Sequence, residues 1–351
     1  RRQRQMCIRD RRKPLMIIAA ITFTVSAIGT GAVNDLNWFI FYRIFGGIGI
    51  GIASNLSPMY IAEVSPSHVR GKFVSINQLT IVLGILAAQF VNWLIADPVV
   101  PGENILETWN GQMGWRWMFW AEVVPSGLFF ILIFFIPESP RWLATKLQYG
   151  KAENILSHIG GKEYAKKEIE SIKTVINVTK EKLNIRLLFQ GKIPGILLIG
   201  IVIAAFQQWC GLNVVFNYAQ EIFAAAGYGV SDILFNIVVT GVTNVIFTFV
   251  GMYTVDKLGR RSLMLFGASG LAIIYIIMGI CYYLNITGMA VLIMVVLAIA
   301  CYAMTLAPVT WVVLSEIFPN RIRGMAMAVS TFSLWAACFV LTYTFPLLNS
   351  G

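Results

Sequence analysis

Side-chain amides recur inside long apolar segments of this sequence, where polar groups are costly unless they have hydrogen-bonding partners. An amide both donates and accepts hydrogen bonds, so a group of amides suits a ligand that carries several hydroxyl groups. Amides also hold neighbouring helices together, but a whole set of them favours binding over that structural role. The set consists of Gln78, Gln207, Gln208, Asn213, Asn217 and Asn244.

The spacing of these amides suggests how some of them meet. Gln208 and Asn213 are about one and a half helical turns apart and approach one cavity if the helix breaks at Gly211. The neighbours Gln207 and Gln208 are expected to point in different directions. Two ionisable residues, Arg43 and Glu122, also lie in apolar segments. An intramembrane charge normally has a partner of opposite sign, and Glu122 is the clearest one for Arg43.

The elements that position these residues must be membrane-spanning helices. Of the 351 residues, 57% are hydrophobic and 13% are charged, whereas a soluble domain has roughly 25% charged residues. A helix needs about 20 apolar residues to cross a bilayer, and strands of a membrane barrel are much shorter. We therefore predict an all-α polytopic membrane protein with about nine spans, at 15–33, 39–60, 74–95, 116–136, 193–213, 233–254, 263–284, 289–314 and 325–348.

The charged residues alternate between the loops. Apart from Arg43 and Arg116, every Lys and Arg lies in alternate loops, while the opposite loops carry acidic residues. The positive-inside rule makes the basic loops cytoplasmic, so the net charge of +10 reflects orientation in the membrane. We expect a multi-pass protein of the cytoplasmic membrane that is surrounded by lipid and binds no nucleic acid.

Two phrases of the sequence occur twice. "EVSPSHVRG" (63–71) returns as "EIFPNRIRG" (316–324), and "RRKPLM" returns as "RRSLM". A duplicated six-helix unit explains both repeats. Residues 11–136 would form a first half without its first two helices, and residues 193–351 a second half without its last helix. Residues 137–192 would form a cytoplasmic linker with short amphipathic helices, and residues 1–10 a non-native segment. We expect such a fragment to be unable to transport.

Two six-helix halves joined by a cytoplasmic linker are the layout of the major facilitator superfamily. Within that superfamily, five stretches resemble the sugar porter family, and most closely its bacterial D-xylose/proton symporters. They are "YRIFGGIGIGIASNLSPMYIAEVSPSHVRGKFVSINQ", "PESPRWL", "QQWCGLNVVFNYA", "VDKLGRR" and "APVTWVVLSEIFPNRIRG". The resemblance implies secondary active transport of a monosaccharide by alternating access.

The resemblance also assigns roles to single residues. It implies that Trp311 and Trp335 lie beneath the sugar, and that Pro308 breaks the helix before Trp311. Leu334 stands where the symporters have a glutamine, which weakens the case for xylose itself. The positions implied to bind sugar hydroxyls are Gln78, Gln207, Gln208, Asn213 and Asn244.

The resemblance implies proton coupling through Arg43. In the resembling symporters, the equivalent arginine faces an aspartate on the first helix, and this aspartate takes up the proton. That helix is not in this sequence, and we retain Glu122 beside Arg43 as a coupling residue. A facilitative sugar carrier keeps such an arginine as well, so uncoupled transport remains an alternative. A sugar sensor that does not transport is a third hypothesis.

The repeated loop motifs suggest ion pairs at the cytoplasmic ends of the helices. Such a network would hold an outward-open state and break as the halves rock inward, although orientation in the membrane and helix capping explain the same residues. The network comprises Glu63, Arg70, Glu138, Arg141, Asp256, Arg260, Arg261, Glu316 and Arg323.

Other functions find little support in the residues. The cysteines share no metal-ligand spacing, and there are only two histidines. No nucleophile, metal or paired-carboxylate pattern indicates an enzyme. We expect no cofactor, no metal and a monomer. The glycines of "GGIGIG" (46–51) lie inside an apolar span and favour close helix packing over nucleotide binding.

Overall fold

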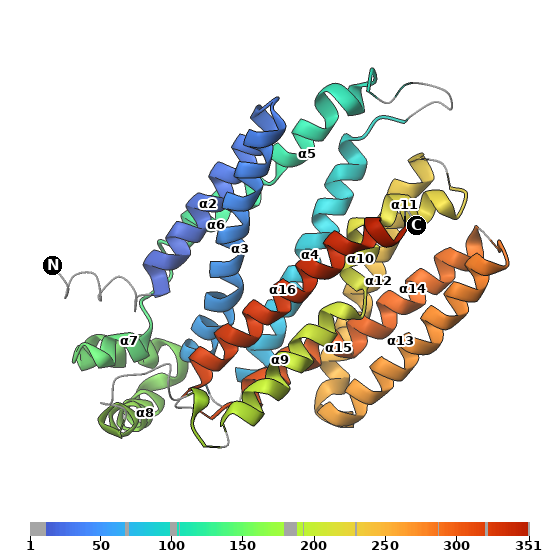
Figure 1. Cartoon of the computed structure of the whole chain (residues 1–351). Coiled ribbons are helices and arrows are strands. Elements are labelled where there is room, and N and C mark those ends of the chain that lie inside the picture. Colours follow the sequence, from blue (N-terminus) through green and yellow to red (C-terminus); the bar gives the residue numbers. More distant parts are fainter. Residues whose placement is uncertain are drawn as a thin grey trace. The chain divides into compact units, whose positions relative to one another are not determined.

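The computed structural model describes residues 12–66, 70–98, 104, 106–178, 188–191, 193–228, 230–286, 288–319 and 322–349. All regular elements within these ranges are helices (Figure 1). The helices gather into two compact units. The first consists of residues 1–77 and 94–182, and the second of residues 78–93 and 183–351. Residues 78–93 thus pack with the second unit, and the division into halves read from the repeat remains a prediction.

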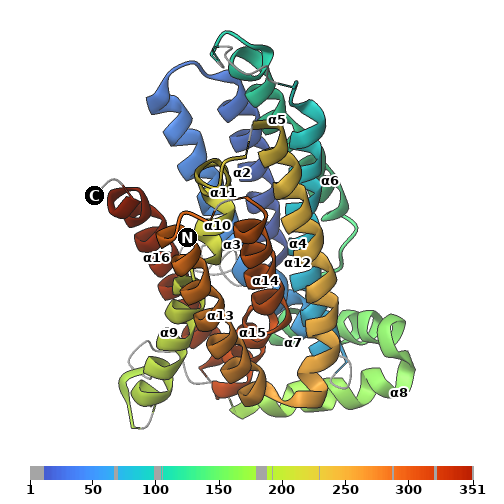
Figure 2. The ribbon, with the colours of Figure 1, turned by 90° about the vertical axis from the view of Figure 1, so that its right-hand side faces the viewer.

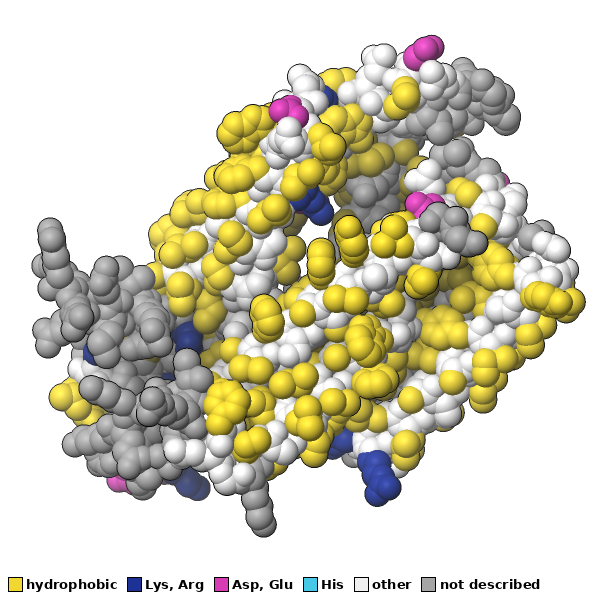
Figure 3. All heavy atoms as spheres, in the orientation of Figure 1, with side chains coloured by type: hydrophobic (Ala, Val, Ile, Leu, Met, Phe, Trp, Pro, Cys, Tyr) yellow, Lys and Arg dark blue, Asp and Glu magenta, His cyan; other side chains and the backbone are white. Residues whose placement is uncertain are grey.

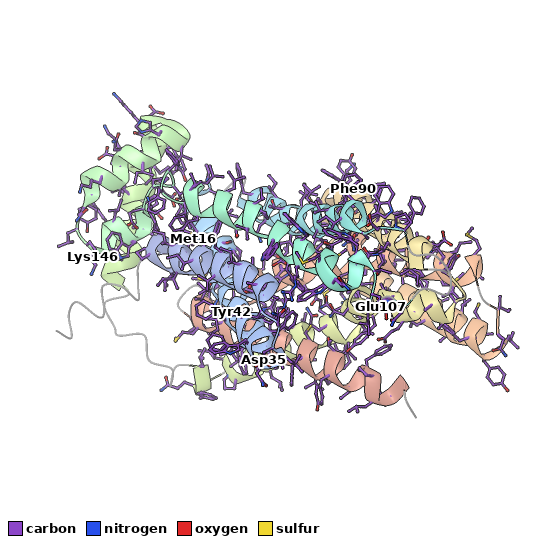
Figure 4. The ribbon with its side chains drawn as sticks, turned by 90° about the horizontal axis from the view of Figure 1, so that it is seen from above. Met16, Asp35, Tyr42, Phe90, Glu107 and Lys146 are labelled. Carbon is purple, nitrogen blue, oxygen red and sulfur yellow. The ribbon has the colours of Figure 1, made fainter. Side chains whose placement is uncertain are left out.

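The first unit is built on α2 (Arg12–Ala32) and α3 (Leu36–Val64), which pack side by side (Figure 1). Asp35 begins α3 by accepting a hydrogen bond from the backbone N of Asn37 at 3.1 Å. Small residues let the two helices approach closely. The ring of Tyr42 lies against Gly29, and its carbonyl accepts a bond from Ser26 at 2.8 Å. Asp35 and Tyr42 are both labelled in Figure 4.

The predicted span 116–136 is not one continuous helix. A short π-helix, η1 (Asn110–Gly114), leads into α5 (Trp115–Ala121), which is followed by α6 (Val123–Leu132). Glu122 lies between α5 and α6. Pro125 has no N–H to donate to the carbonyl of Ala121, so the regular bonding is interrupted at this point.

Arg116 is an exception to the charge alternation because it caps a helix. Its guanidinium donates to the carbonyls of Gly31 at 2.7 Å and Val33 at 3.0 Å, at the C-terminal end of α2. It also donates to the side chain of Asn34. A cation is favourable at this negative end of the helix dipole, so Arg116 has a local role there.

Helices also form within residues 137–192, the stretch predicted to be a linker. They are α7 (Pro140–Thr145) and α8 (Tyr149–Val178), and α8 bends at Gly161, whose φ of 86° favours glycine. Ser139 caps α7 by accepting a bond from the backbone N of Trp142 at 3.3 Å. The two helices share a small core of their own that includes Trp142, Leu156 and Ile169.

The second unit contains the largest buried clusters. Its helices include α12 (Val230–Leu258) and α14 (Met289–Met304), which pack together (Figure 2). Residues 78–93 join this unit from α4. The helices are α4 (Arg70–Ile95), α9 (Ile193–Trp209), α10 (Leu212–Asn217), α11 (Ala219–Ala225), α12 (Val230–Leu258), α13 (Arg260–Tyr283), α14 (Met289–Met304), α15 (Leu306–Ile317) and α16 (Arg323–Asn349).

Eight helical segments of the described chain are long and apolar enough to cross a membrane. Their outer surfaces are apolar, as the yellow side chains along α13 and α16 show (Figure 3). Ile276 on α13 and Phe332 on α16 are 63% and 75% exposed. Such surfaces are stable against lipid and not against water. The segments are Arg12–Ala32, Leu36–Ile61, Ile76–Ile95, Ile193–Asn217, Asp232–Val255, Arg260–Tyr283, Met289–Leu314 and Arg323–Leu348.

Candidate functional site

A break in one membrane-spanning segment creates the centre of the site. Helix α9 ends at Trp209 and α10 begins at Leu212, because Gly211 adopts a left-handed conformation with φ 81° and ψ −1°. Glycine adopts this conformation without steric cost. The carbonyl of Cys210, at the break, accepts a hydrogen bond from the Tyr275 hydroxyl at 2.7 Å. The break occurs at the glycine that the sequence indicated.

Three amides form a continuous hydrogen-bonded chain across this break. The amide nitrogen of Asn213 donates to Oε1 of Gln208, and Nε2 of Gln208 donates to Oε1 of Gln207 at 2.8 Å. Nε2 of Gln207 then donates to the hydroxyl of Tyr302 at 2.5 Å. Gln207 and Gln208 are each 7% exposed. The expectation that these two residues point apart was therefore wrong, because their long side chains bend toward each other.

The other amides of the set lie on α4, α10 and α12. Asn244 is buried on α12, and its backbone carbonyl accepts a bond from Thr248 at 2.7 Å. Gln78 lies half-buried on α4, and Asn217 is exposed at the end of α10. For the side-chain amides of Gln78 and Asn244, no hydrogen bond to another described residue is recorded, so the structure does not join them to the chain.

The two tryptophans differ in their surroundings. Trp311 on α15 is partly buried and packs against a cluster that contains Leu314 and Leu334. Leu334 is only 1% exposed, whereas its neighbour Trp335 on α16 is 42% exposed. The side chain of Leu334 therefore fills the interior of the unit, and Trp335 is left on its surface.

A second break separates α14 from α15. It falls at Thr305, with φ −119° and ψ −83°, three residues before Pro308. Pro308 has no N–H to donate to the carbonyl of Met304, which frees the backbone there to change direction. The break predicted before Trp311 is thus present. Trp311 belongs to the short helix α15 that follows it.

Arg43 and Glu122 lie in the same unit but do not form an ion pair. The guanidinium of Arg43 is 5.3 Å from the centre of the Phe119 ring, a cation–π contact. Glu122, between α5 and α6, is near enough for its charge to interact electrostatically with that of Arg43. Within the described part of the chain, no contact of 4.0 Å or less is recorded between their charged atoms.

The repeated loop motifs are partly joined by ion pairs. In the first unit Glu63 pairs with Arg12 at 3.1 Å and accepts a bond from Ser139 at 2.6 Å. In the second unit Glu316 pairs with Arg260 at 3.2 Å. These glutamates occupy equivalent positions in the repeated phrase, so each repeat ties its own glutamate to an arginine of the preceding "RR" loop.

The remaining motif residues have other surroundings. Nε of Arg323 donates to the carbonyl of Phe318 at 3.3 Å. The carboxylate oxygen Oε2 of Glu138 is buried, and the arginines Arg141 and Arg261 are exposed. The side chains of Arg70 and Asp256, which belong to the predicted network, lie outside the described residues.

Sequence reasoning missed several residues of the first unit that form hydrogen bonds near the start of α2 and the end of α3. Lys13 donates to the carbonyls of Phe134 and Ile136, each at 2.8 Å. The hydroxyl of Tyr60 donates to the carbonyl of Pro137, also at 2.8 Å. Arg12 and Lys13 stand in the repeated "RRKPLM" phrase, which was a usable signal. Tyr60 and Ser139 lie within stretches that carry the family resemblance, but no role was predicted for either residue.

The apolar spans, the helix break bridged by amides, the second break before Trp311 and the ion pairs between the repeated motifs are typical of a multi-pass membrane transporter. The chain belongs to the sugar (and other) transporter family, whose sequence model matches residues 8–351. Its fold is the major facilitator fold of that family, as predicted.

Individual relatives agree with this assignment. The D-xylose-proton symporter of Escherichia coli is 39% identical, over 97% of this chain and 71% of the relative. The arabinose-proton symporter of Bacillus subtilis is 35% identical, over 96% and 71%. The xylose transporter of Escherichia coli, solved in a partially occluded inward-open conformation, superimposes with a TM-score of 0.81 at 36% identity, over 96% of this chain and 74% of that chain.

Proposed function

We propose that the protein carries a monosaccharide, a pentose or a hexose, across the bacterial cytoplasmic membrane by alternating access. The observation that carries this proposal is the chain of amides across the α9–α10 break. A sugar presents several hydroxyl groups that each donate and accept hydrogen bonds, and the amides match them. Gln207, Gln208 and Asn213 form the centre of the proposed site, and Gln78 and Asn244 add further amides.

The tryptophans supply the second part of sugar recognition. The C–H face of a sugar ring is apolar, and an indole covers such a face. Trp311 stands on the short helix after the break at Thr305, so a movement of α15 would carry it toward or away from the substrate. Trp335 offers an exposed indole.

Proton symport is the proposed source of energy. The relatives named as proton symporters support it, and the charges of Arg43 and Glu122 interact in this chain. A carboxylate that takes up a proton no longer attracts the guanidinium. Arg43 is then free to move, and this shifts the equilibrium between outward-open and inward-open states.

The ion pairs at the cytoplasmic ends are proposed to act as a gate. Arg12 with Glu63 and Arg260 with Glu316 tie loops that must rearrange when the inner mouth opens. The protein would act as a monomer within the lipid bilayer, without a cofactor and without catalysing a reaction. Its family is one of transporters, which favours transport over catalysis.

Facilitated, uncoupled transport is the second candidate. It is favoured by the position of Arg43, whose nearest recorded partner in the described chain is the Phe119 ring and not a carboxylate. An arginine held in this way would be a structural charge, and the sugar site would work without it.

The experiment is uptake of labelled xylose and glucose by the full-length protein in proteoliposomes, with and without an inward proton gradient. Accumulation above equilibrium that a protonophore abolishes is the expected result. Equilibration that ignores the gradient would leave a sugar carrier and refute coupling. No saturable uptake or binding of any monosaccharide would refute the proposed substrate class.

A further inference from the structure

The amide chain ends on a tyrosine. Tyr302 lies on α14, and its hydroxyl accepts the hydrogen bond from Nε2 of Gln207 at 2.5 Å. The half-buried ring packs among the apolar residues around Leu271 and Ala298. It is therefore held in place by the core of the second unit, while its oxygen reaches the polar chain.

The hydrogen bonds run in one direction along the chain. Gln207 turns its nitrogen toward Tyr302 and its oxygen toward Gln208, and Gln208 turns its oxygen toward Asn213. A hydroxyl group can donate as well as accept, so Tyr302 does not choose this direction. Its bond holds the Gln207 amide in place, and the other two amides bond in sequence from Gln207.

The far end of the chain has a weaker anchor. The amide nitrogen of Asn213 also lies 3.5 Å from the sulfur of Cys338 on α16. A thiol is a poor hydrogen-bonding group, so it holds the amide less firmly than a phenol does. Tyr302 is therefore the stronger anchor of the two.

We propose that Tyr302 is a positioning residue, whose hydroxyl holds the Gln207 amide, and through it the chain of amides, in one fixed arrangement and thereby sets the choice of the site among sugar epimers. This inference rests on the proposed function, since it assigns the discrimination to the same site. Epimers differ in the direction of a single hydroxyl group, and a site built to bond that hydroxyl discriminates when its amides cannot turn.

The position of Tyr302 fits this role. It precedes the break at Thr305, so it belongs to α14 and not to the segment that carries Trp311. A movement of α15 at the break leaves the anchor of the amide chain in place. The arrangement of the amides is thereby kept while the tryptophan moves.

The test is Tyr302→Phe, which removes one oxygen atom. Equilibrium binding of D-xylose, L-arabinose, D-glucose and D-galactose is measured on the purified protein, together with its melting temperature. We expect binding of the preferred sugar to weaken about 5- to 20-fold, and the ratio of affinities between epimers to shrink. Tyr302→His restores a ring nitrogen as a hydrogen-bonding group and should recover part of that ratio.

Tyr282→Phe is the matched control. Its hydroxyl donates to the carbonyl of Ile222 at 3.3 Å, away from the amides, and its loss should leave the affinity ratio unchanged. A second measurement combines Tyr302→Phe with Asn213→Ala. The two residues do not bond to each other, so a non-additive effect on binding shows that the chain links them.

The outcomes separate this inference from the proposed function. If the unmodified protein binds sugars and Tyr302→Phe keeps the same affinity ratio, or if the double variant is additive, the inference is wrong and the sugar site stands. If the unmodified protein binds none of the four sugars in this assay, the proposed substrate and the inference both fail.

Discussion

Glu63 illustrates how a single carboxylate joins three parts of the first unit. It pairs with Arg12 at the start of α2 and accepts a bond from Ser139 at the start of α7. Its side chain is 13% exposed, whereas that of Glu316, the equivalent residue in the second repeat, is 55% exposed. Exposed ion pairs contribute little because water screens them. The two repeats therefore share a motif but differ in how much it stabilises them.

This difference predicts unequal effects of the same substitution. Glu63→Gln should lower the free energy of unfolding by about 1 to 2 kcal/mol, because it leaves Arg12 without its counter-charge in a partly buried place. Glu316→Gln should change it by less than about 0.5 kcal/mol. Thermal unfolding of both variants in the same detergent compares them, and equal losses would show that burial does not set the contribution of the pair.

Broken helices are the elements that build the site. Gly211 separates α9 from α10, and Thr305 separates α14 from α15. The second break is packed tightly. A methyl group added to Gly251 on α12 would lie 2.8 Å from the carbonyl oxygen of Met304 and 3.0 Å from that of Ala303. Since both atoms belong to the backbone, a side chain at this position must displace the joint itself.

Gly251→Ala is therefore expected to destabilise the protein by about 1 to 3 kcal/mol, the usual cost of overpacking. It should also slow sugar transport, because the joint that carries Trp311 is displaced. The control is Gly279→Ala on α13, where an added methyl group meets nothing within 4 Å. That variant should melt at the same temperature as the parent or slightly above it. Parallel losses in the two variants would contradict the steric argument.

The orientation of the whole molecule in the membrane follows from the placement of its charges. Lys257, Arg260 and Arg261 stand at the α12–α13 connection, and Glu221 stands in the first turn of α11. The positive-inside rule places the first group in the cytoplasm and Glu221 on the opposite side.

Cysteine labelling tests this orientation. In intact cells, a membrane-impermeant thiol reagent should modify Glu221→Cys. It should modify Arg261→Cys only after the membrane is opened. Both side chains are exposed, so a difference in reactivity reports the side of the membrane. The unsubstituted protein measures the background from its own cysteines, and the reverse labelling pattern would invert the proposed orientation.

The sequence by itself determined the class of protein. The apolar spans, the alternation of charge, the repeated motifs and the helix breaks at Gly211 and before Pro308 all depend on residues close together in the chain. Such signals are local, since a bilayer selects for segment length and composition, and glycine and proline act on their own backbone.

Only the tertiary structure decided which distant groups meet. The link from Gln207 to Tyr302, the choice of Arg12 as the partner of Glu63, and the cap that Arg116 places on α2 join residues far apart in the sequence. Many polar side chains were available for each of these contacts. Which ones come within hydrogen-bonding distance depends on how the helices pack and turn, and that arrangement is a property of the whole core.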